Sequence, residues 1–146
     1  SPARQSHVLI GAFLVAVAIA SIGQSRYRTA IRTGRDLEHD LVADEPQRLG
    51  GEDAGPAPFD LLVSALGACT AITLTMYAEK KHWPLEGLEV RLEYLGGETP
   101  PRIERVLVPA GPLDDAQRAR LADVAERTPV TLAIKNGLAV HTSLQL

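Results

Sequence analysis

The chain lacks the cysteine pairs that stabilise many small secreted domains. It has one cysteine, Cys69, among 146 residues, so no disulfide can form within a single chain. Secreted domains of this size often carry an even number of cysteines, which makes a reducing compartment the better expectation. We therefore predict a cytoplasmic protein.

The chain also lacks a large excess of charge of one sign. The net charge is −3 and positive and negative residues are interspersed, so the sequence has no basic face of the kind that binds nucleic acid. An uncharged apolar run covers residues 8–22, but a transmembrane helix needs about 20 apolar residues. We therefore expect no nucleic-acid partner, and a membrane partner is disfavoured.

Sequence motifs for metal and nucleotide binding are absent as well. The four histidines are His7, His39, His82 and His141. They lie far apart, without helical i,i+4 pairs and without a cysteine at ligand spacing, so we expect no metal. No Gly-x-Ser-x-Gly motif occurs, and Gly50-Gly51 lacks the lysine of a phosphate-binding loop. We also expect no cofactor.

The apolar run at residues 8–22 divides the chain into an N-terminal segment, residues 1–25, and a main domain, residues 26–146. Three fates are open for the segment: a packed strand, a packed helix, or a signal or anchor. The third follows from Arg4 ahead of the run and the small-residue pattern at 18–20. It would place the protein in the cell envelope instead of the cytoplasm.

Alternating polar and apolar residues predict a hairpin over residues 26–43, with its turn at Thr33-Gly34. A loop rich in proline and glycine follows up to Pro58, and we interpret Asp44-Glu45 within it as a solvated turn. Residues 59–81 are apolar or small on nearly every helical face, which predicts a buried helix.

Strict alternation predicts a second hairpin from residues 88–95 and 103–108. Asp114 and Gln117 form the pattern of a capping box, which predicts a second helix from 114 to about 127, ended by Pro129. Residues 137–146 are predicted to form a last strand.

This order of elements indicates an α+β fold in which antiparallel sheets cover a central helix. One sheet can cover only one side of a helix that is apolar all round. A second copy of the chain is the simplest cover for the other side, so we predict a homodimer.

Cys69 lies in the middle of that helix. Its neighbours at helical spacing are Leu62, Ala65, Leu66, Ile72, Thr73 and Met76. None is charged, and apolar surroundings disfavour a thiolate, so the helix alone favours an inert core cysteine. A reactive cysteine would need a cation from elsewhere, for which the arginines of the first hairpin are candidates.

Several segments in order resemble the OsmC/Ohr family, the osmotically inducible and organic hydroperoxide resistance proteins. They are residues 41–46, 50–51, 55–62, 65–70, 76–78, 83–85, 111–114, 118–121 and 125–129. The resemblance runs from about residue 26 to the C-terminus. It implies an intertwined homodimer in which antiparallel sheets wrap two central helices.

The resemblance also implies a chemistry. In active members a cysteine on the central helix attacks an organic hydroperoxide and becomes a sulfenic acid, which condenses with a second, resolving cysteine. Cys69 matches the first position, and Thr128 matches the second. The resemblance assigns the helper groups of the thiolate to Arg35 or Arg28 and, loosely, to Asp60. As apolar walls of the substrate site we expect Phe59, Leu62, Met76 and Tyr77.

A threonine cannot form the disulfide, so two functions remain open. The first is a one-cysteine peroxidase, in which an external thiol reduces the sulfenic acid of Cys69. The second is a non-catalytic protein of the same fold that binds a small hydrophobic molecule. A third possibility is an envelope-located variant that uses the apolar N-terminus.

Overall fold

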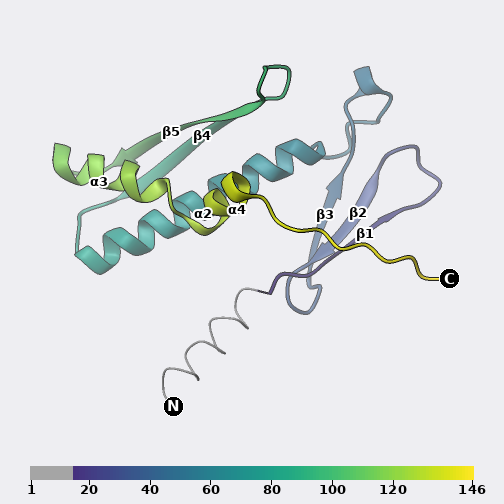
Figure 1. The fold of residues 1–146 in the computed structure, drawn as a ribbon, viewed down its shortest axis with the longest axis horizontal. Helices are drawn as coiled ribbons and strands as arrows, with labels where there is room; N and C mark the ends of the chain where they lie inside the picture. Colours follow the sequence, from purple (N-terminus) through teal and green to yellow (C-terminus); the bar gives the residue numbers. More distant parts are fainter. Residues whose placement is uncertain (1–14) are drawn as a thin grey trace, which may run out of the picture. The chain divides into compact units, whose positions relative to one another are not determined.

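The computed structural model describes residues 15–146 of the chain, which divides into two compact units, one ending at Asp60 and one spanning Leu61–Leu146. The elements are β1 (Ala18–Ile22), β2 (Thr29–Thr33), β3 (His39–Ala43), a 3-10 helix (Gln47–Leu49), α2 (Pro58–Lys81), β4 (Gly87–Leu95), β5 (Arg102–Ala110), α3 (Asp115–Ala125) and α4 (Pro129–Asn136) (Figure 1). The predicted α+β class with antiparallel sheets is confirmed.

The first unit contains a three-stranded antiparallel sheet in the order β1-β2-β3. The predicted first hairpin is present as β2 and β3, with Ile31 opposite Leu41. Strand β1 pairs with the other edge of β2, so residues 18–22 of the apolar run form a strand. The predicted boundary at residue 25 lies between β1 and β2. Residues 8–14 of the run lie outside the described residues.

Asp44 organises the loop that follows β3. Its side chain is buried, and its carboxylate accepts hydrogen bonds from the backbone N–H groups of Glu45, Glu52 and Ala54. The chain passes so close to itself that a Cβ on Gly51 would lie 1.9 Å from the Glu45 carbonyl oxygen. Our interpretation of Asp44 as part of a solvated turn is therefore wrong: it is a buried acceptor that orders the loop.

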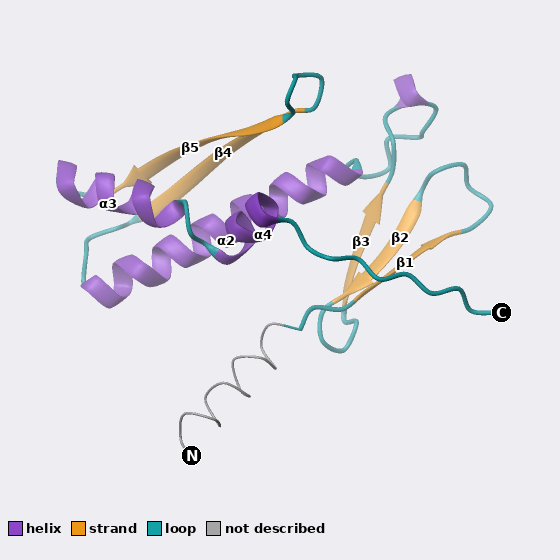
Figure 2. Ribbon diagram, viewed as in Figure 1, coloured by secondary structure: helices purple, strands orange, loops and turns teal. Residues whose placement is uncertain are grey.

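In the second unit the β4–β5 hairpin lies along α2 (Figure 2). Both predictions, the hairpin and the long helix, are confirmed. The buried residues of α2 are Leu66, Thr70, Leu74 and Ala78, one ridge at i,i+4 spacing. A Cβ on Gly67 would lie 2.7 Å from Cδ1 of Leu92, so glycine permits the close approach of the hairpin to the helix.

The opposite side of α2 is left exposed by residues 15–146. Ile72 is 55% exposed and Met76 is 63% exposed, although the sequence predicted a helix buried on every face. The helix is also long and apolar enough to cross a membrane by length and composition, with a mean hydropathy of 1.7. The core helix of a soluble protein passes the same test, and α2 carries a buried ridge.

Helix α3 begins with the predicted capping box. The Asp114 side chain accepts from the Gln117 N–H at 2.7 Å, and the Gln117 side chain accepts from the Asp114 N–H at 3.0 Å. The core cluster of this unit brings α2 and α3 together and consists of Leu74, Leu113, Leu121 and Ala125. Full burial of such side chains stabilises a fold by about 1.5–3 kcal/mol each.

The C-terminal region differs from the sequence prediction in two ways. Pro129 does not merely end the preceding helix; it occupies the first turn of α4, where its missing N–H costs no hydrogen bond. Residues 137–146 form no strand, and all of them are exposed (Figure 2). A strand needs a neighbour for its backbone hydrogen bonds, and none pairs with this segment within the described chain.

Candidate functional site

Cys69 lies near the middle of α2 and is partly buried. The next residue, Thr70, is fully buried and donates from its hydroxyl to the Leu66 carbonyl at 2.6 Å. The Cys69 sulfur lies 3.8 Å from the hydroxyl oxygen of Thr73, one turn further along. Cys69 is therefore at the border between the buried ridge and the more exposed side of α2.

The first turn of α4 faces this sulfur. Thr128 is the N-cap of α4, and the backbone N–H of Val130 donates to Cys69 Sγ with an N···S distance of 3.5 Å. The first N–H groups of a helix have no acceptor within the helix, so this donor is free to serve the sulfur. The N-terminal end of a helix also carries a partial positive charge. Both features stabilise negative charge on sulfur.

A largely buried cation contacts Thr70, the residue after Cys69, and it comes from β5 instead of the first hairpin. Arg105 of β5 has a side chain that is only 12% exposed. Its Nη1 donates to the hydroxyls of Thr131, at 2.8 Å, and Thr70, at 3.1 Å. Its Nη2 donates to the Ala125 carbonyl at 2.9 Å. The guanidinium thereby joins α2, the end of α3 and the start of α4.

Around the guanidinium lies a small charged network. Glu126 Oε1 is 3.9 Å from Arg105 Nη2, and the other oxygen of Glu126 pairs with Lys135. The hydrogen bond from Lys135 is the main cause that lowers the pKa of Glu126. Glu126 is thus a carboxylate at neutral pH and balances part of the positive charge near the site.

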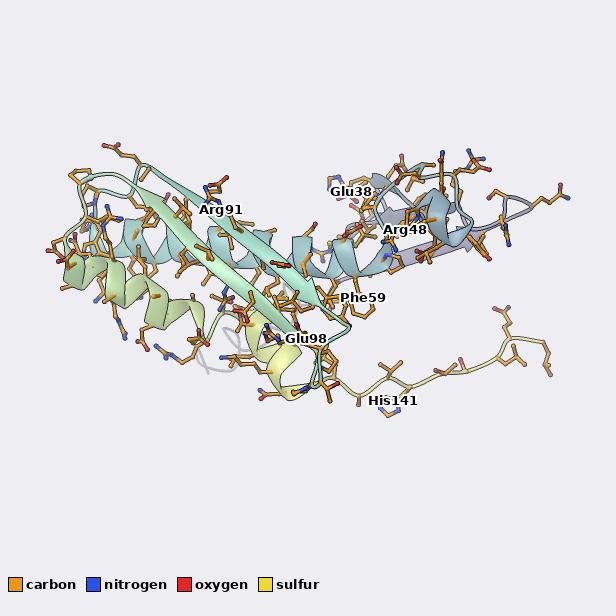
Figure 3. The ribbon with its side chains drawn as sticks, turned by 90° about the horizontal axis from the view of Figure 1, so that it is seen from above. Glu38, Arg48, Phe59, Arg91, Glu98 and His141 are labelled. Carbon is orange, nitrogen blue, oxygen red and sulfur yellow. The ribbon has the colours of Figure 1, made fainter. Side chains whose placement is uncertain are left out.

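A cavity of about 500 Å³ opens beside this network. Apolar side chains that line it include Leu62, Leu66, Ile103 and Ile134. Charged residues, among them Arg105, lie at other points of its wall. The hairpin end that bears Glu98 (Figure 3) is also the end that contributes the strand residues of the wall. A cavity with apolar walls and a few polar groups is typical of small-molecule sites.

The predicted resolving position, Thr128, belongs to the same region. Its side chain is 1% exposed, and its hydroxyl lies 2.6 Å from that of Thr131. One residue, Pro129, separates it from Val130, whose N–H reaches Cys69 Sγ. The structure thus brings the segment that carries Thr128 against Cys69, as the family resemblance implies for the two positions.

The four predicted apolar walls lie in different places. Leu62 lines the cavity. Tyr77 instead packs its ring edge-on against Trp83 at a centroid distance of 5.5 Å and accepts a hydrogen bond from Arg120, so it belongs to the core region. Met76 borders a shallower depression on the exposed side of α2. Phe59, labelled in Figure 3, is 51% exposed in the first turn of α2.

The predicted helper groups have other contacts in the described chain. Arg35 is exposed in the turn between β2 and β3, and Arg28 is exposed and contributes to the low pKa of Asp44. Asp60 accepts from the Ala57 N–H at 2.9 Å and so closes the start of α2. Their assignment to the thiolate stays a prediction.

The residues that sequence reasoning missed are Arg105 and Val130. A signal for Arg105 was present: within the alternating strand 103–108 it stands at an inward-facing position between Ile103 and Leu107. Nothing in the sequence marked the Val130 amide. Among residues 15–146 no group of three or more His, Cys, Asp or Glu side chains is arranged to hold a metal ion.

Several solved structures share this fold. An organic hydroperoxide resistance protein from Legionella pneumophila is 20% identical, with a TM-score of 0.63 over 83% of this chain and 89% of its own. The organic hydroperoxide resistance protein OhrB of Bacillus subtilis is 20% identical, with a TM-score of 0.59 over 86% and 93%. An OsmC-like protein of Mycoplasma pneumoniae is 16% identical, with a TM-score of 0.64 over 84% and 87%.

Comparison with curated proteins gives no match. The sequence model of OsmC-like proteins, however, matches residues 50–143, which include α2 with Cys69, the β4–β5 hairpin and both later helices. That match covers more than half of the chain and contains every element of the site around Cys69. The chain belongs to the OsmC-like protein family.

Proposed function

We propose that the protein is a one-cysteine peroxidase that reduces organic hydroperoxides through Cys69. The main support is the hydrogen bond from the Val130 N–H to Cys69 Sγ. The next residue, Thr131, lines a cavity with several apolar side chains in its wall. The names of the Legionella and Bacillus proteins, which refer to organic hydroperoxide resistance, support the same substrate class.

In this reaction the thiolate of Cys69 attacks the terminal oxygen of the hydroperoxide. The O–O bond breaks, the alkoxide leaves and takes up a proton to become an alcohol, and Cys69 becomes a sulfenic acid. The α4 amide stabilises the sulfur before the attack, when it is negatively charged. The chain has no second cysteine, so an external thiol attacks the sulfenic sulfur, water leaves, and a second thiol releases Cys69 from the mixed disulfide.

Consumption of cumene hydroperoxide in the presence of excess dithiothreitol tests this function. Because Cys69 is the only cysteine, the pair of wild type and Cys69→Ser isolates its contribution completely. We expect the wild type to consume peroxide catalytically and Cys69→Ser to match the rate without protein. Equal consumption by both proteins would contradict the proposal.

A second function is favoured by the cavity itself. The cavity lining does not include Cys69, so a hydrophobic molecule can bind there without any use of the thiol. A non-catalytic binding protein would keep its affinity for a fluorescent apolar probe in Cys69→Ser and lose it when Leu62 is replaced by Asp. The peroxidase, in contrast, would lose its turnover of hydroperoxide in Cys69→Ser.

We further propose that the protein acts as a homodimer in the cytoplasm. The exposed side of α2, with Ile72 and Met76, is a large apolar surface that a second copy would cover. A reducing compartment fits the external thiol that the proposed cycle requires. The envelope alternative depends on the apolar run at residues 8–22, of which residues 8–14 lie outside the described residues.

A further inference from the structure

Arg105 is a largely buried cation whose contacts do not include the cysteine sulfur. Three of its hydrogen bonds reach groups on three different elements: the Thr70 hydroxyl on α2, the Ala125 carbonyl at the end of α3, and the Thr131 hydroxyl in the first turn of α4. Hydrogen bonds from a charged donor are stronger than those between neutral groups, so this is a strong attachment.

These contacts enclose the connection between α3 and α4. Ala125 stands at one end of residues 126–130 and Thr131 follows the other end, and both are bound by the same guanidinium. This stretch runs into the first turn of α4, where the Val130 N–H donates to Cys69 Sγ. Thr70, the third partner of the guanidinium, is the residue after Cys69. One side chain therefore fixes both the donor and the helix that bears its acceptor.

We propose that Arg105 is a positioning residue that sets the reactivity of Cys69 by holding the first turn of α4 against the sulfur. This inference rests on the proposed function in that it treats Cys69 as the reactive group. It assigns the control of Cys69 reactivity to a residue of β5 and not to the arginines of the N-terminal strands.

An alternative is that Arg105 acts only by its positive charge. The two roles can be separated because lysine keeps the charge but lacks the planar fork that reaches several acceptors at once. Loss of one hydrogen bond to a charged sulfur corresponds to a decrease of about tenfold in reactivity. If position matters, Arg105→Lys loses this factor; if charge alone matters, it does not.

The test uses alkylation of Cys69 by iodoacetamide, which requires no hydroperoxide and therefore does not depend on turnover. Rates are measured from pH 5 to pH 10, expressed as a pH profile, for the wild type, Arg105→Lys and Arg105→Gln. Arg102→Gln is the matched control, since Arg102 is on the same strand and pairs with Glu98 and Glu104 instead. Glu126 and Lys135, the titratable neighbours of the guanidinium, are the same in every variant.

We expect both Arg105 variants to alkylate about tenfold more slowly at pH 7, with profiles displaced to higher pH, while Arg102→Gln follows the wild type. Wild-type behaviour of Arg105→Lys would overturn the inference in favour of charge alone. Wild-type behaviour of both Arg105 variants would overturn it in favour of a merely structural residue.

Circular dichroism at the assay temperature verifies that each variant is folded. If the Arg105 variants do not fold, Thr131→Val provides the test, because it removes the α4 acceptor and leaves the arginine in place. We expect the same slowing in Thr131→Val, and an unchanged profile would overturn the inference. A protein that alkylates as expected but consumes no peroxide would instead refute the proposed function.

Discussion

A cysteine at position 128 should restore a two-cysteine cycle. Thr128 is the N-cap of α4, two residues before the amide that reaches Cys69 Sγ. In Thr128→Cys the sulfenic acid of Cys69 has a thiol close by, so we expect an intramolecular disulfide after one equivalent of hydroperoxide. The chain then loses two hydrogen atoms in mass, and peptide mapping joins the fragments that contain positions 69 and 128.

The size of the accompanying stabilisation follows from the loop that the disulfide closes. Positions 69 and 128 enclose about 60 residues, for which the loss of loop entropy in the unfolded chain amounts to about 4 kcal/mol. Replacement of the Thr128 hydroxyl removes its hydrogen bond to Thr131, which costs about 1 kcal/mol. We therefore expect oxidised Thr128→Cys to be more stable than its reduced form by roughly 4 kcal/mol, and than the wild type by roughly 3 kcal/mol.

The assay compares urea denaturation of the oxidised and the reduced variant, with intact mass measured on the same samples. Cys69→Ser/Thr128→Cys is the control, since it keeps the new thiol and cannot form the bond within one chain. If both thiols become oxidised without a disulfide, our placement of the resolving position at Thr128 is refuted.

Two further predictions concern the loop after β3 and the exposed side of α2. Burial opposes the charge of Asp44, but the N–H groups of Ala54, Glu45 and Glu52 outweigh it and lower its pKa below the ordinary 3.8. As the pH falls, the Asp44 carboxylate therefore takes up its proton at a lower pH in the folded protein than in the unfolded chain. The stabilisation by the ionised Asp44 is fully present above pH 3.8 and is lost as the pH falls through the lower, folded-state pKa. Asp44→Asn should therefore be less stable than the wild type at pH 7 and differ less at pH 3, measured by urea denaturation; a difference that does not change with pH would contradict this. Ile72→Glu should convert the dimer to a monomer in light scattering, whereas Lys80→Glu at the exposed end of the helix should not, and a monomeric wild type would refute the burial argument.

The sequence predicted helices and strands correctly where a single local pattern of residues determines them. The alternation of polar and apolar residues was sufficient to predict the β4–β5 hairpin, and the capping box placed the start of α3 at Asp114. Helix α4 was missed because Pro129 was interpreted only as a stop, although a proline after Thr128 also suits the first turn of a helix. The strand predicted over 137–146 was wrong because alternation cannot show whether a partner strand exists.

The site itself was predictable only in part. The family resemblance located Cys69 and Thr128, and the structure brings their segments together. Arg105 could not be assigned, because its role arises from tertiary contacts with residues 20 to 35 positions away in the sequence. The Val130 amide has no sequence signature at all, since every residue except proline carries such a group.

Trapping of the sulfenic acid shows whether Cys69 is an activated thiol. The protein is mixed with one equivalent of cumene hydroperoxide in the presence of dimedone, and its intact mass is followed with time. We expect a dimedone adduct on Cys69 that forms much faster than on an unstructured peptide of residues 65–73. An unmodified protein, or labelling no faster than that of the peptide, would contradict it and leave Cys69 as a core residue beside a binding cavity.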